Sequence, residues 1–303
     1  MLNILRTVKT PHGVIRTIRY NDACEYAITT GNDRSIKLWN PLTGALLKSY
    51  SGHSQDVLDA VSSTDNSEIL SAGGDKAVYL YDVITGVIKR RFLEHLSKVN
   101  CVRFNSDSSL MLSASDDNTI KLWDARSKSN AAVQTLSDAS DAVTCIDTSD
   151  YEILSSSLDK SSRIYDIRFG QLISDFIGDE LTFCRFGGEN QLILLAALNS
   201  TIKLFDRMSG GLFNEYADCS SAKYKLECAF AVDDKLVVSG SENGGLCVWN
   251  LIDCMLIYGG KIKQETAAVT SVVSHSKEPW ILASQGNFYH LIDLSEIMKS
   301  SKK

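Results

Sequence analysis

Proline is rare in this sequence, with three residues in 303, and charged residues make up only 22% of the chain. Disordered chains are usually rich in proline and charge and poor in apolar residues, whereas 44% of these residues are hydrophobic. The longest apolar run, Leu192–Leu198, is far shorter than the roughly 20 residues of a membrane helix. The start, Met1–Thr7, is too short and too soon interrupted for a signal peptide. These absences predict a soluble, folded, intracellular protein without a membrane segment.

The eight cysteines lack the spacing of a metal site or of a disulfide framework. No C-x-x-C pair and no paired His-Cys cluster occurs, although structural zinc needs such patterns. Cys101 and Cys145 stand at the same place in two similar segments, Val99–Val102 and Val143–Ile146, as small apolar core residues do. The sequence therefore predicts structural thiols, with no disulfide, metal or cofactor, at Cys24, Cys101, Cys145, Cys184, Cys219, Cys228, Cys247 and Cys254.

The charge of the chain points to proteins rather than nucleic acid as partners. The net charge is −6 and the pI is about 5.4. Nucleic-acid binders usually present a basic face, because neutralising phosphates supplies much of their affinity. The basic runs here, Lys89–Arg91 and the tail from Lys299 to Lys303, are short. Direct binding of nucleic acid is therefore not favoured.

An aromatic residue followed by an acid or amide recurs along the chain at intervals of 40 to 44 residues. Six such pairs each end an apolar–polar–apolar run: Trp39-Asn40, Tyr81-Asp82, Trp123-Asp124, Tyr165-Asp166, Phe205-Asp206 and Trp249-Asn250. A seventh, degraded copy ends at Leu291-Ile292-Asp293. This period resembles that of WD40 repeats, each of which supplies one four-stranded blade. The resemblance implies an all-β, seven-bladed WD40 β-propeller.

The third repeat, residues 95–136, shows the pattern of one blade. Val99–Phe104 alternates apolar and polar residues, as a half-buried strand does. We expect this inner strand to be followed by strands at Leu110–Ser115, Thr119–Asp124 and Ala132–Leu136, with polar turns between them.

The seventh repeat lacks an outer strand. Its other three strands are expected at Val269–Ser274, Trp280–Ser284 and Phe288–Asp293. The N-terminal stretch Asn3–Lys9 has no blade of its own, and an open sheet edge is a liability that closure removes. We therefore predict one domain over residues 1–294 in which residues 1–9 complete the last blade. Residues 295–303 are expected to form a short polar tail.

A histidine, a hydroxyl residue, an aspartate and an aromatic residue recur together in the second and third repeats: His53, Ser71, Asp75 and Tyr81, then His95, Ser113, Asp117 and Trp123. Although Ser, His and Asp are the members of a catalytic triad, the Ser and Asp positions recur in other repeats with gradual decay. A chemical site occurs once, so we expect buried structural networks and no enzyme. In the second repeat we expect the Tyr81 hydroxyl to replace the tryptophan indole as hydrogen-bond donor. In the first repeat His12 stands one position away from the place that His53 and His95 occupy in theirs.

The fifth repeat is expected to replace this polar network by apolar packing. Leu195 stands at the hydroxyl position and Phe205 at the indole position. Removing both partners of a buried hydrogen bond together is close to neutral for stability.

One face of the propeller carries the candidate binding residues. The turns between the second and third strands of each blade, and the loops that enter the first strand, share a face. A mixed-charge surface of this kind suits a peptide or protein better than a polyanion. The residues expected there are Asn32, Arg34, Asp56, Lys76, Lys98, Asp116, Asn118, Asp141 and Lys160.

Several segments resemble the mitogen-activated protein kinase organizer 1 family. They are Ser51–His53 with Val57–Ala60, Gly73–Val78, His95 to Asn100 with Phe104-Asn105, Trp123–Ser127, Asp166–Leu172 and Tyr224–Cys228. The sequence departs from the family pattern at Ile292, where an aromatic residue is expected, and at Ala217–Ser220, which lacks a Gly-His pair.

The family resemblance implies a non-catalytic scaffold for other proteins, in the pre-mRNA splicing machinery, in a mitogen-activated protein kinase module, or in both. It further implies a cytoplasmic and nuclear protein that is a monomer outside its complexes.

A second function remains open from the sequence. The run from Leu112 to Arg126 fits the motif by which some propellers dock on a cullin-4 ubiquitin ligase adaptor, and Tyr165–Arg168 echoes it. On this alternative, Arg126 and Arg168 would hold the adaptor.

Overall fold

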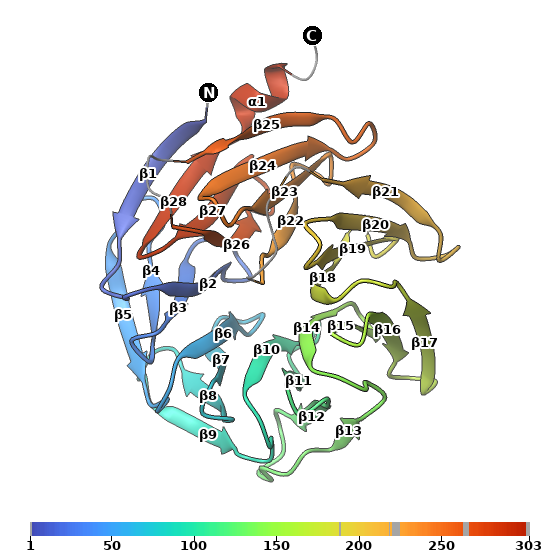
Figure 1. Cartoon of the computed structure of the whole chain (residues 1–303). Coiled ribbons are helices and arrows are strands. Elements are labelled where there is room, and N and C mark those ends of the chain that lie inside the picture. The colour runs from blue at the N-terminus through green and yellow to red at the C-terminus, as the bar shows by residue number, and fades with distance from the viewer. Residues whose placement is uncertain (1, 188, 218, 220–224, 263–266, 301–303) are drawn as a thin grey trace.

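The computed structural model describes residues 2–187, 189–217, 219, 225–262 and 267–300. Seven antiparallel four-stranded sheets stand side by side in a ring (Figure 1). This confirms the predicted seven-bladed propeller. Within each blade the four strands are called a to d from the centre outward.

The strands follow the chain in order. Blade 1 contains β2 (Ile15–Tyr20), β3 (Ala27–Gly31), β4 (Ser35–Trp39) and β5 (Leu46–Ser51). Blade 2 contains β6 (Val57–Ser62), β7 (Glu68–Gly73), β8 (Val78–Asp82) and β9 (Ile88–Phe92). Blade 3 contains β10 (Val99–Phe104), β11 (Leu110–Ser115), β12 (Ile120–Asp124) and β13 (Gln134–Leu136). Blade 4 contains β14 (Val143–Thr148), β15 (Glu152–Ser157), β16 (Ser161–Asp166) and β17 (Gln171–Phe176). Blade 5 contains β18 (Leu181–Gly187), β19 (Leu192–Ala197), β20 (Ile202–Asp206) and β21 (Leu212–Tyr216). Blade 6 contains β22 (Cys228–Ala231), β23 (Leu236–Gly240), β24 (Gly245–Asn250) and β25 (Leu256–Lys261).

The N-terminal strand closes the ring, as predicted. Blade 7 contains β26 (Val269–Ser274), β27 (Trp280–Gln285), β28 (Phe288–Asp293) and, as strand d, β1 (Asn3–Lys9). The pairing of β1 with β28 is antiparallel and runs from Asn3 opposite Asp293 to Lys9 opposite Phe288. The first and last strands of the chain are thereby held in one sheet (Figure 1).

Part of the expected polar tail is packed. Ser295–Ser300, within the segment expected to be a short polar tail, form a short helix, α1. Ile297 on this helix is 4% exposed and joins the core cluster between blades 6 and 7. Met298 also packs against this cluster. Two apolar residues in an otherwise polar segment are a weak sequence signal, so this packing was not predicted.

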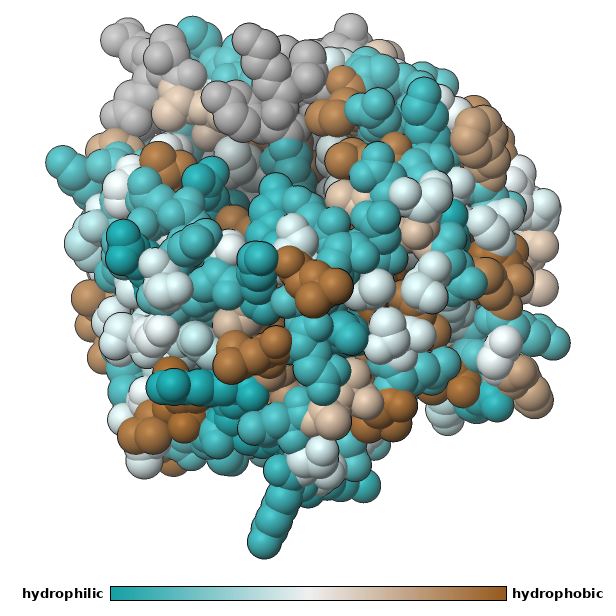
Figure 2. Space-filling view, turned by 60° about the horizontal axis from the view of Figure 1, so that its bottom comes forward, coloured by the Kyte–Doolittle hydropathy of each residue, from teal (hydrophilic) through white to brown (hydrophobic). Residues whose placement is uncertain are grey.

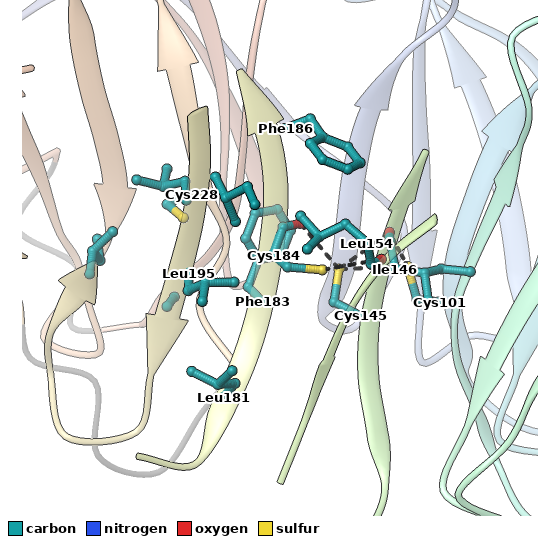
Figure 3. Packing of buried hydrophobic residues seen from close by; sticks show 14 of the residues in the cluster. Cys101, Cys145, Ile146, Leu154, Leu181, Phe183, Cys184, Phe186, Leu195 and Cys228 are labelled. Atoms are coloured by element: carbon teal, nitrogen blue, oxygen red, sulfur yellow. Dashed lines mark hydrogen bonds between the residues drawn. The ribbon is translucent and has the colours of Figure 1, made fainter. Parts of the chain in front are cut away.

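The cores lie between neighbouring blades, where alternate side chains of strands a, b and c meet. The largest cluster spans blades 3 to 6 and contains Cys101, Cys145 and Cys184 on successive a strands (Figure 3). Leu195 of blade 5 is 1% exposed in the same cluster, with Phe205 packed against it. Blade 5 therefore carries apolar packing where blade 3 carries a polar network.

The prediction of thiols throughout is wrong for one pair of cysteines. Cys219 and Cys247 form a disulfide across 28 residues, with 6.3 Å between their Cα atoms. Cys219 follows the outer strand of blade 5, whereas Cys247 lies on β24 of blade 6, so the stacking of blades brings them together. A search for local cysteine motifs cannot find such a pair. Cys101, Cys145, Cys184 and Cys228 are buried thiols.

No helix within the described ranges has the length and apolar character to cross a membrane.

Candidate functional site

The turns between strands b and c place the expected cationic side chains in solvent. In the turns of blades 1 to 6 an Asp or Asn side chain accepts a hydrogen bond from the backbone N–H two residues later, as Asp117 does from Thr119 at 3.1 Å. This Asx-type turn sets the residue between them in the left-handed region. The φ angles are 63° at Arg34, 65° at Lys76, 66° at Asn118 and 68° at Lys160. Equivalent side chains therefore start from the same geometry in four blades.

These turns and the loops entering the a strands form one side of the ring, here called the loop face. Arg34, Lys76 and Lys160 are exposed there. Asn118 is half-buried and donates to the backbone carbonyl of Ser140 at 3.3 Å. Asn32 accepts a hydrogen bond from the Val14 N–H at 2.8 Å and is engaged within its own blade.

The centre of the loop face is the mouth of the axial channel, a cavity of about 240 Å³ lined by residues including Arg16, Lys98, Asn100 and Glu227. At its rim, Arg16 pairs with Asp56 at 2.7 Å and Lys98 pairs with Asp116 at 3.1 Å. The structure thus brings together three predicted residues, Asp56, Lys98 and Asp116. Asp141 is exposed but does not line this cavity.

Sequence reasoning missed Arg16 and Asn100, which also shape the mouth. Asn100 donates to Asp116 at 2.6 Å and to the Val143 carbonyl at 2.9 Å. Each is the second residue of an a strand, and side chains alternate between the two faces of a strand. A polar residue directly after the first apolar residue of strand a is the sequence signal that could have placed these side chains at the cavity.

A buried ion network lies deeper in the channel and was also missed. Arg19 contacts Glu227 at 2.5 Å and Asp59 at 3.1 Å. Asp59 also pairs with Arg103 at 2.8 Å, and Arg103 lies 3.5 Å from Asp147. Arg19, Asp59 and Glu227 are between 1% and 7% exposed. The inner strands of blades 1 to 4 and the segment before β22 are therefore held by alternating charges.

The charges of this network are fixed by their neighbours. Burial alone would raise the pKa of Asp59, but the nearby Arg19 and Arg103 hold that pKa well below its usual range. Burial likewise opposes ionisation of Glu227, and Arg19 outweighs it, so the pKa of Glu227 is lowered. Both carboxylates are ionised at neutral pH. Their charges are compensated within the protein, so the network acts as a structural element.

The polar network of blade 3 has the expected members. His95 Nδ1 lies 2.8 Å from Asp117, and His95 Nε2 lies 2.7 Å from the Ser113 hydroxyl. The indole N–H of Trp123 donates to the same hydroxyl at 2.9 Å. Ser113 is fully buried, so no substrate can reach its hydroxyl. Burial opposes ionisation of Asp117, yet the hydrogen bonds from His95 and Thr119 lower its pKa below the ordinary value.

Blade 2 departs from the expected network at the aromatic position. His53 contacts Asp75 at 2.9 Å and Ser71 at 2.7 Å. The Tyr81 hydroxyl is buried without a hydrogen-bond partner in the described part of the chain. A phenol carries its hydroxyl at the ring tip, which points toward Gly52, whereas an indole carries its N–H on the side of the ring. The Tyr81 hydroxyl thus interacts with Ser71 without the hydrogen-bond geometry that the Trp123 indole has with Ser113.

Blade 1 has a network that the sequence spacing concealed. His12 contacts Asp33 at 2.6 Å and Thr29 at 2.9 Å, and the Trp39 indole donates to Thr29 at 2.8 Å. His12 is displaced by one residue in the sequence, but its side chain is 2% exposed and reaches the same partners. The loop before β2 absorbs the difference in length.

Replacing His95 by alanine should destabilise the fold without affecting a chemical activity. We expect a loss of roughly 1–3 kcal/mol, because Asp117 and Ser113 lose buried hydrogen bonds. Leu96→Ala, at an 80% exposed neighbour, should change stability by no more than about half a kcal/mol. Urea unfolding of both variants measures the difference. A hydrolase activity present in the wild type and absent from folded His95→Ala would contradict the structural role.

The two arginines of the alternative function lie on the opposite side of the ring. Arg126 pairs with Asp107 at 3.8 Å, and its side chain is 77% exposed. The Arg168 guanidinium stacks over the Tyr151 ring at 3.8 Å. Asp107 and Tyr151 belong to turns between strands a and b. Neither arginine is near the loop face.

The surface is mixed in character. Figure 2 shows small apolar groups interspersed with hydrophilic residues on the face that it presents. Within the described residues, no group of three or more His, Cys, Asp or Glu side chains could hold a metal ion. The loop face is therefore a mixed-charge surface built from charge pairs and loops.

Comparison with known proteins agrees with this architecture. The model of the WD domain, G-beta repeat, matches residues 3–40, 44–82, 86–124 and 224–250. WD repeat domain-containing protein 83 of Rattus norvegicus is 50% identical over 93% of this chain and 89% of its own length. The chain belongs to this family. The Homo sapiens member is 49% identical over the same shares, and an uncharacterized WD repeat-containing protein of Schizosaccharomyces pombe is 48% identical over 78% of this chain and 80% of its own.

Membership in the WD repeat domain-containing protein 83 family confirms the resemblance found in the sequence motifs. The aligned regions include the blades that carry the histidine networks and the loop-face turns, since they cover nearly the whole chain. The family name describes repeats rather than a reaction. Function must therefore be argued from the surfaces of this ring.

Proposed function

We propose that this chain is a non-catalytic scaffold that assembles a multiprotein complex, of the pre-mRNA splicing machinery or of a mitogen-activated protein kinase module. The observation that carries the proposal is the loop face, where charge pairs surround an open cavity of about 240 Å³. Such a surface offers both signs of charge to a folded partner or a peptide. A rigid ring can present several partners at fixed positions.

The absence of catalysis is part of the proposal and rests on the hydroxyl and histidine positions. Ser113 is fully buried, and His95 is 4% exposed. Both are already engaged in hydrogen bonds with each other and with Trp123 or Asp117. A nucleophile must meet its substrate, and these groups cannot.

A scaffold of this kind is expected in cytoplasm and nucleus and as a monomer outside its complexes. Its partners are other proteins. The second candidate, docking on a cullin-4 ligase adaptor, is favoured by one observation, the exposed Arg126 on the opposite face. The stacking of Arg168 on Tyr151 disfavours it, because that guanidinium is already occupied.

Affinity purification of the tagged chain from its native organism, followed by mass spectrometry, tests the function. We expect splicing factors or kinase-module components to be enriched over an untagged control. Enrichment of a cullin adaptor in place of these proteins would replace the proposal with the second candidate.

A further inference from the structure

In three blades the outer strand ends in an aromatic residue that fills the groove to the next blade. Tyr50, Phe92 and Tyr216 are each 1% exposed. Their rings lie 5.8 Å from Tyr81, 4.8 Å from Trp123 and 5.7 Å from Trp249, measured between centroids. Each partner is the strand c aromatic of the following blade. The outer strand of one blade thus seals the core of its neighbour.

Blade 4 carries an aromatic residue at the same place in its sequence. Tyr50, Phe92 and Tyr216 each follow a turn glycine by six residues, and Phe176 follows Gly170 by the same number. Gly170 has the same left-handed backbone as the other turn glycines, with φ 64°. By sequence alone, Phe176 should fill the groove between blades 4 and 5.

The structure places Phe176 outside this groove instead. In blades 1, 2 and 5 the pairing of strands c and d contains a bulge, for example between Leu38 and Trp39. The pairing of β16 with β17 has no such shift, so Asp175 lies opposite Ser162. A slip of one residue turns every side chain to the other face. Phe176 is consequently 75% exposed.

The groove between blades 4 and 5 is left open. It has a volume of about 230 Å³ and is lined by Ile164, Ile173 and Asp175 from blade 4 and by Ile193 and Phe205 from blade 5. Phe205 is the strand c aromatic that Phe176 would have covered. All six residues of β17 are exposed, and the outer edge of this strand is not paired within the described sheet.

Blade 6 shows what covers a groove when the aromatic plug is missing. Gly260 stands opposite Leu246, at the register position that Tyr50 occupies opposite Ile36. A separate segment, α1, supplies the missing side chain there. Ile297 packs in the cluster that joins Leu246 of blade 6 to Ile292 of blade 7. In blade 4 the half-buried Ile177, directly after β17, packs against the core cluster and lines part of the groove. No separate described segment covers the remaining volume as α1 does in blade 6.

The charges around the open groove indicate the character of its occupant. The Asp175 carboxylate lines the groove without a hydrogen bond or ion pair to the residues that the structure describes. Asp206 lies at the same groove, and the nearby Arg207 is neutralised by its ion pair with Glu152. An apolar floor beside an uncompensated carboxylate suits a large apolar side chain followed by a basic one.

We infer that the groove between blades 4 and 5 binds an extended segment of a partner protein. The segment pairs with the free edge of β17, as in strand addition to an exposed sheet edge. One large apolar side chain enters the groove against Phe205, and a neighbouring lysine or arginine meets Asp175. This site lies on the rim of the ring and is independent of the loop face and of the function proposed above.

The site is tested by selecting, from a displayed library of random ten-residue peptides, those that bind the full-length chain. Selected peptides should share a large apolar residue next to lysine or arginine. The variant Asp175→Phe fills the groove from within and should weaken the binding of these peptides at least about tenfold. Its melting temperature should be no lower than that of the wild type. Asp253→Phe, the same change at an exposed loop of blade 6, should leave them bound. Peptides that bind Asp175→Phe equally well would overturn the inference.

The position of Phe176 in solution is a second test. Phe176→Ala should leave the melting temperature nearly unchanged, whereas Phe92→Ala should lower it by roughly 5–15 °C. Equal losses would mean that Phe176 fills its own groove, which would refute the site. Sedimentation that shows a dimer of the wild type and a monomer of Asp175→Phe would also refute it, because the occupant would then be a second copy.

Discussion

Deleting residues 1–9 should cause aggregation or a large fall in the melting temperature. The deletion removes β1 along its whole length and exposes the edge of β28 in blade 7. Leu2, Ile4 and Val8 also lose their packing against the cores of blades 6, 7 and 1. Full burial of such a side chain is worth about 1.5–3 kcal/mol, and these are half-buried. Together with the lost strand pairing, the deficit is a large part of a net stability of about 5–15 kcal/mol.

Two point variants separate packing from the loss of a strand. Ile4→Ser should destabilise the protein because Ile4 contacts the core. Leu5→Ser should have little effect because Leu5 is 44% exposed in the same strand. Thermal unfolding followed by circular dichroism gives both values. An unchanged melting curve for the deletion would mean that the ring does not depend on β1 for closure.

Replacing Arg19 by methionine should be the most destabilising single substitution considered for this protein. The change leaves Glu227 and Asp59 buried without their shared cation. Breaking a buried ion pair by removing one partner costs about 3–5 kcal/mol. Arg16→Met provides the matched control, because its pair with Asp56 is exposed and worth about 0–1 kcal/mol. Urea unfolding at neutral pH compares them.

The deficit of Arg19→Met should shrink as the pH is lowered. In the wild type the pKa values of Asp59 and Glu227 are depressed by folding. The two carboxylates therefore contribute to the free energy of unfolding at pH values above their pKa in the unfolded chain, and this contribution is lost as the pH falls toward their pKa in the folded protein. Without Arg19, Asp59 keeps its pair with Arg103, whereas Glu227 loses its ion-pair partner, so burial raises the pKa of Glu227. Protonation of Glu227 at lower pH then relieves its unpaired charge. Equal stability of Arg19→Met and Arg16→Met at neutral pH would show that the buried ion network does not stabilise the fold.

The repeat pattern predicted the architecture because it reports local physics. A period near 42 residues fixes the number of blades, and alternation fixes strands such as β10 and β11, whose bounds agree with those expected. The polar network of blade 3 was also predictable, since its members recur at constant spacing. These features depend on neighbours within one blade.

The features that were missed depend on how blades meet. Arg19 and Glu227 are 208 residues apart in the chain, and only closure of the ring brings them into contact. Cys219 and Cys247 join two blades in the same way. The exposed Phe176 depends on whether β17 contains a bulge, and a turn of equal length accommodates both registers. The direction of the Tyr81 hydroxyl depends on side-chain geometry that spacing does not encode.

The use of the loop face for partner binding is the central claim, and two sets of variants test it directly. One set reverses the charge of Arg34, Lys76 and Lys160, which are exposed on the loop face. The other replaces Arg126 and Arg168, on the opposite face, by alanine. Because all five side chains project from loops, folding should change by no more than about half a kcal/mol per site.

Quantitative purification of partners with each set from native cells is the deciding measurement. The account predicts that the loop-face reversals release the splicing or kinase components while the arginine pair retains them. Loss of those components only in the arginine pair, with the loop-face reversals still bound, would contradict it.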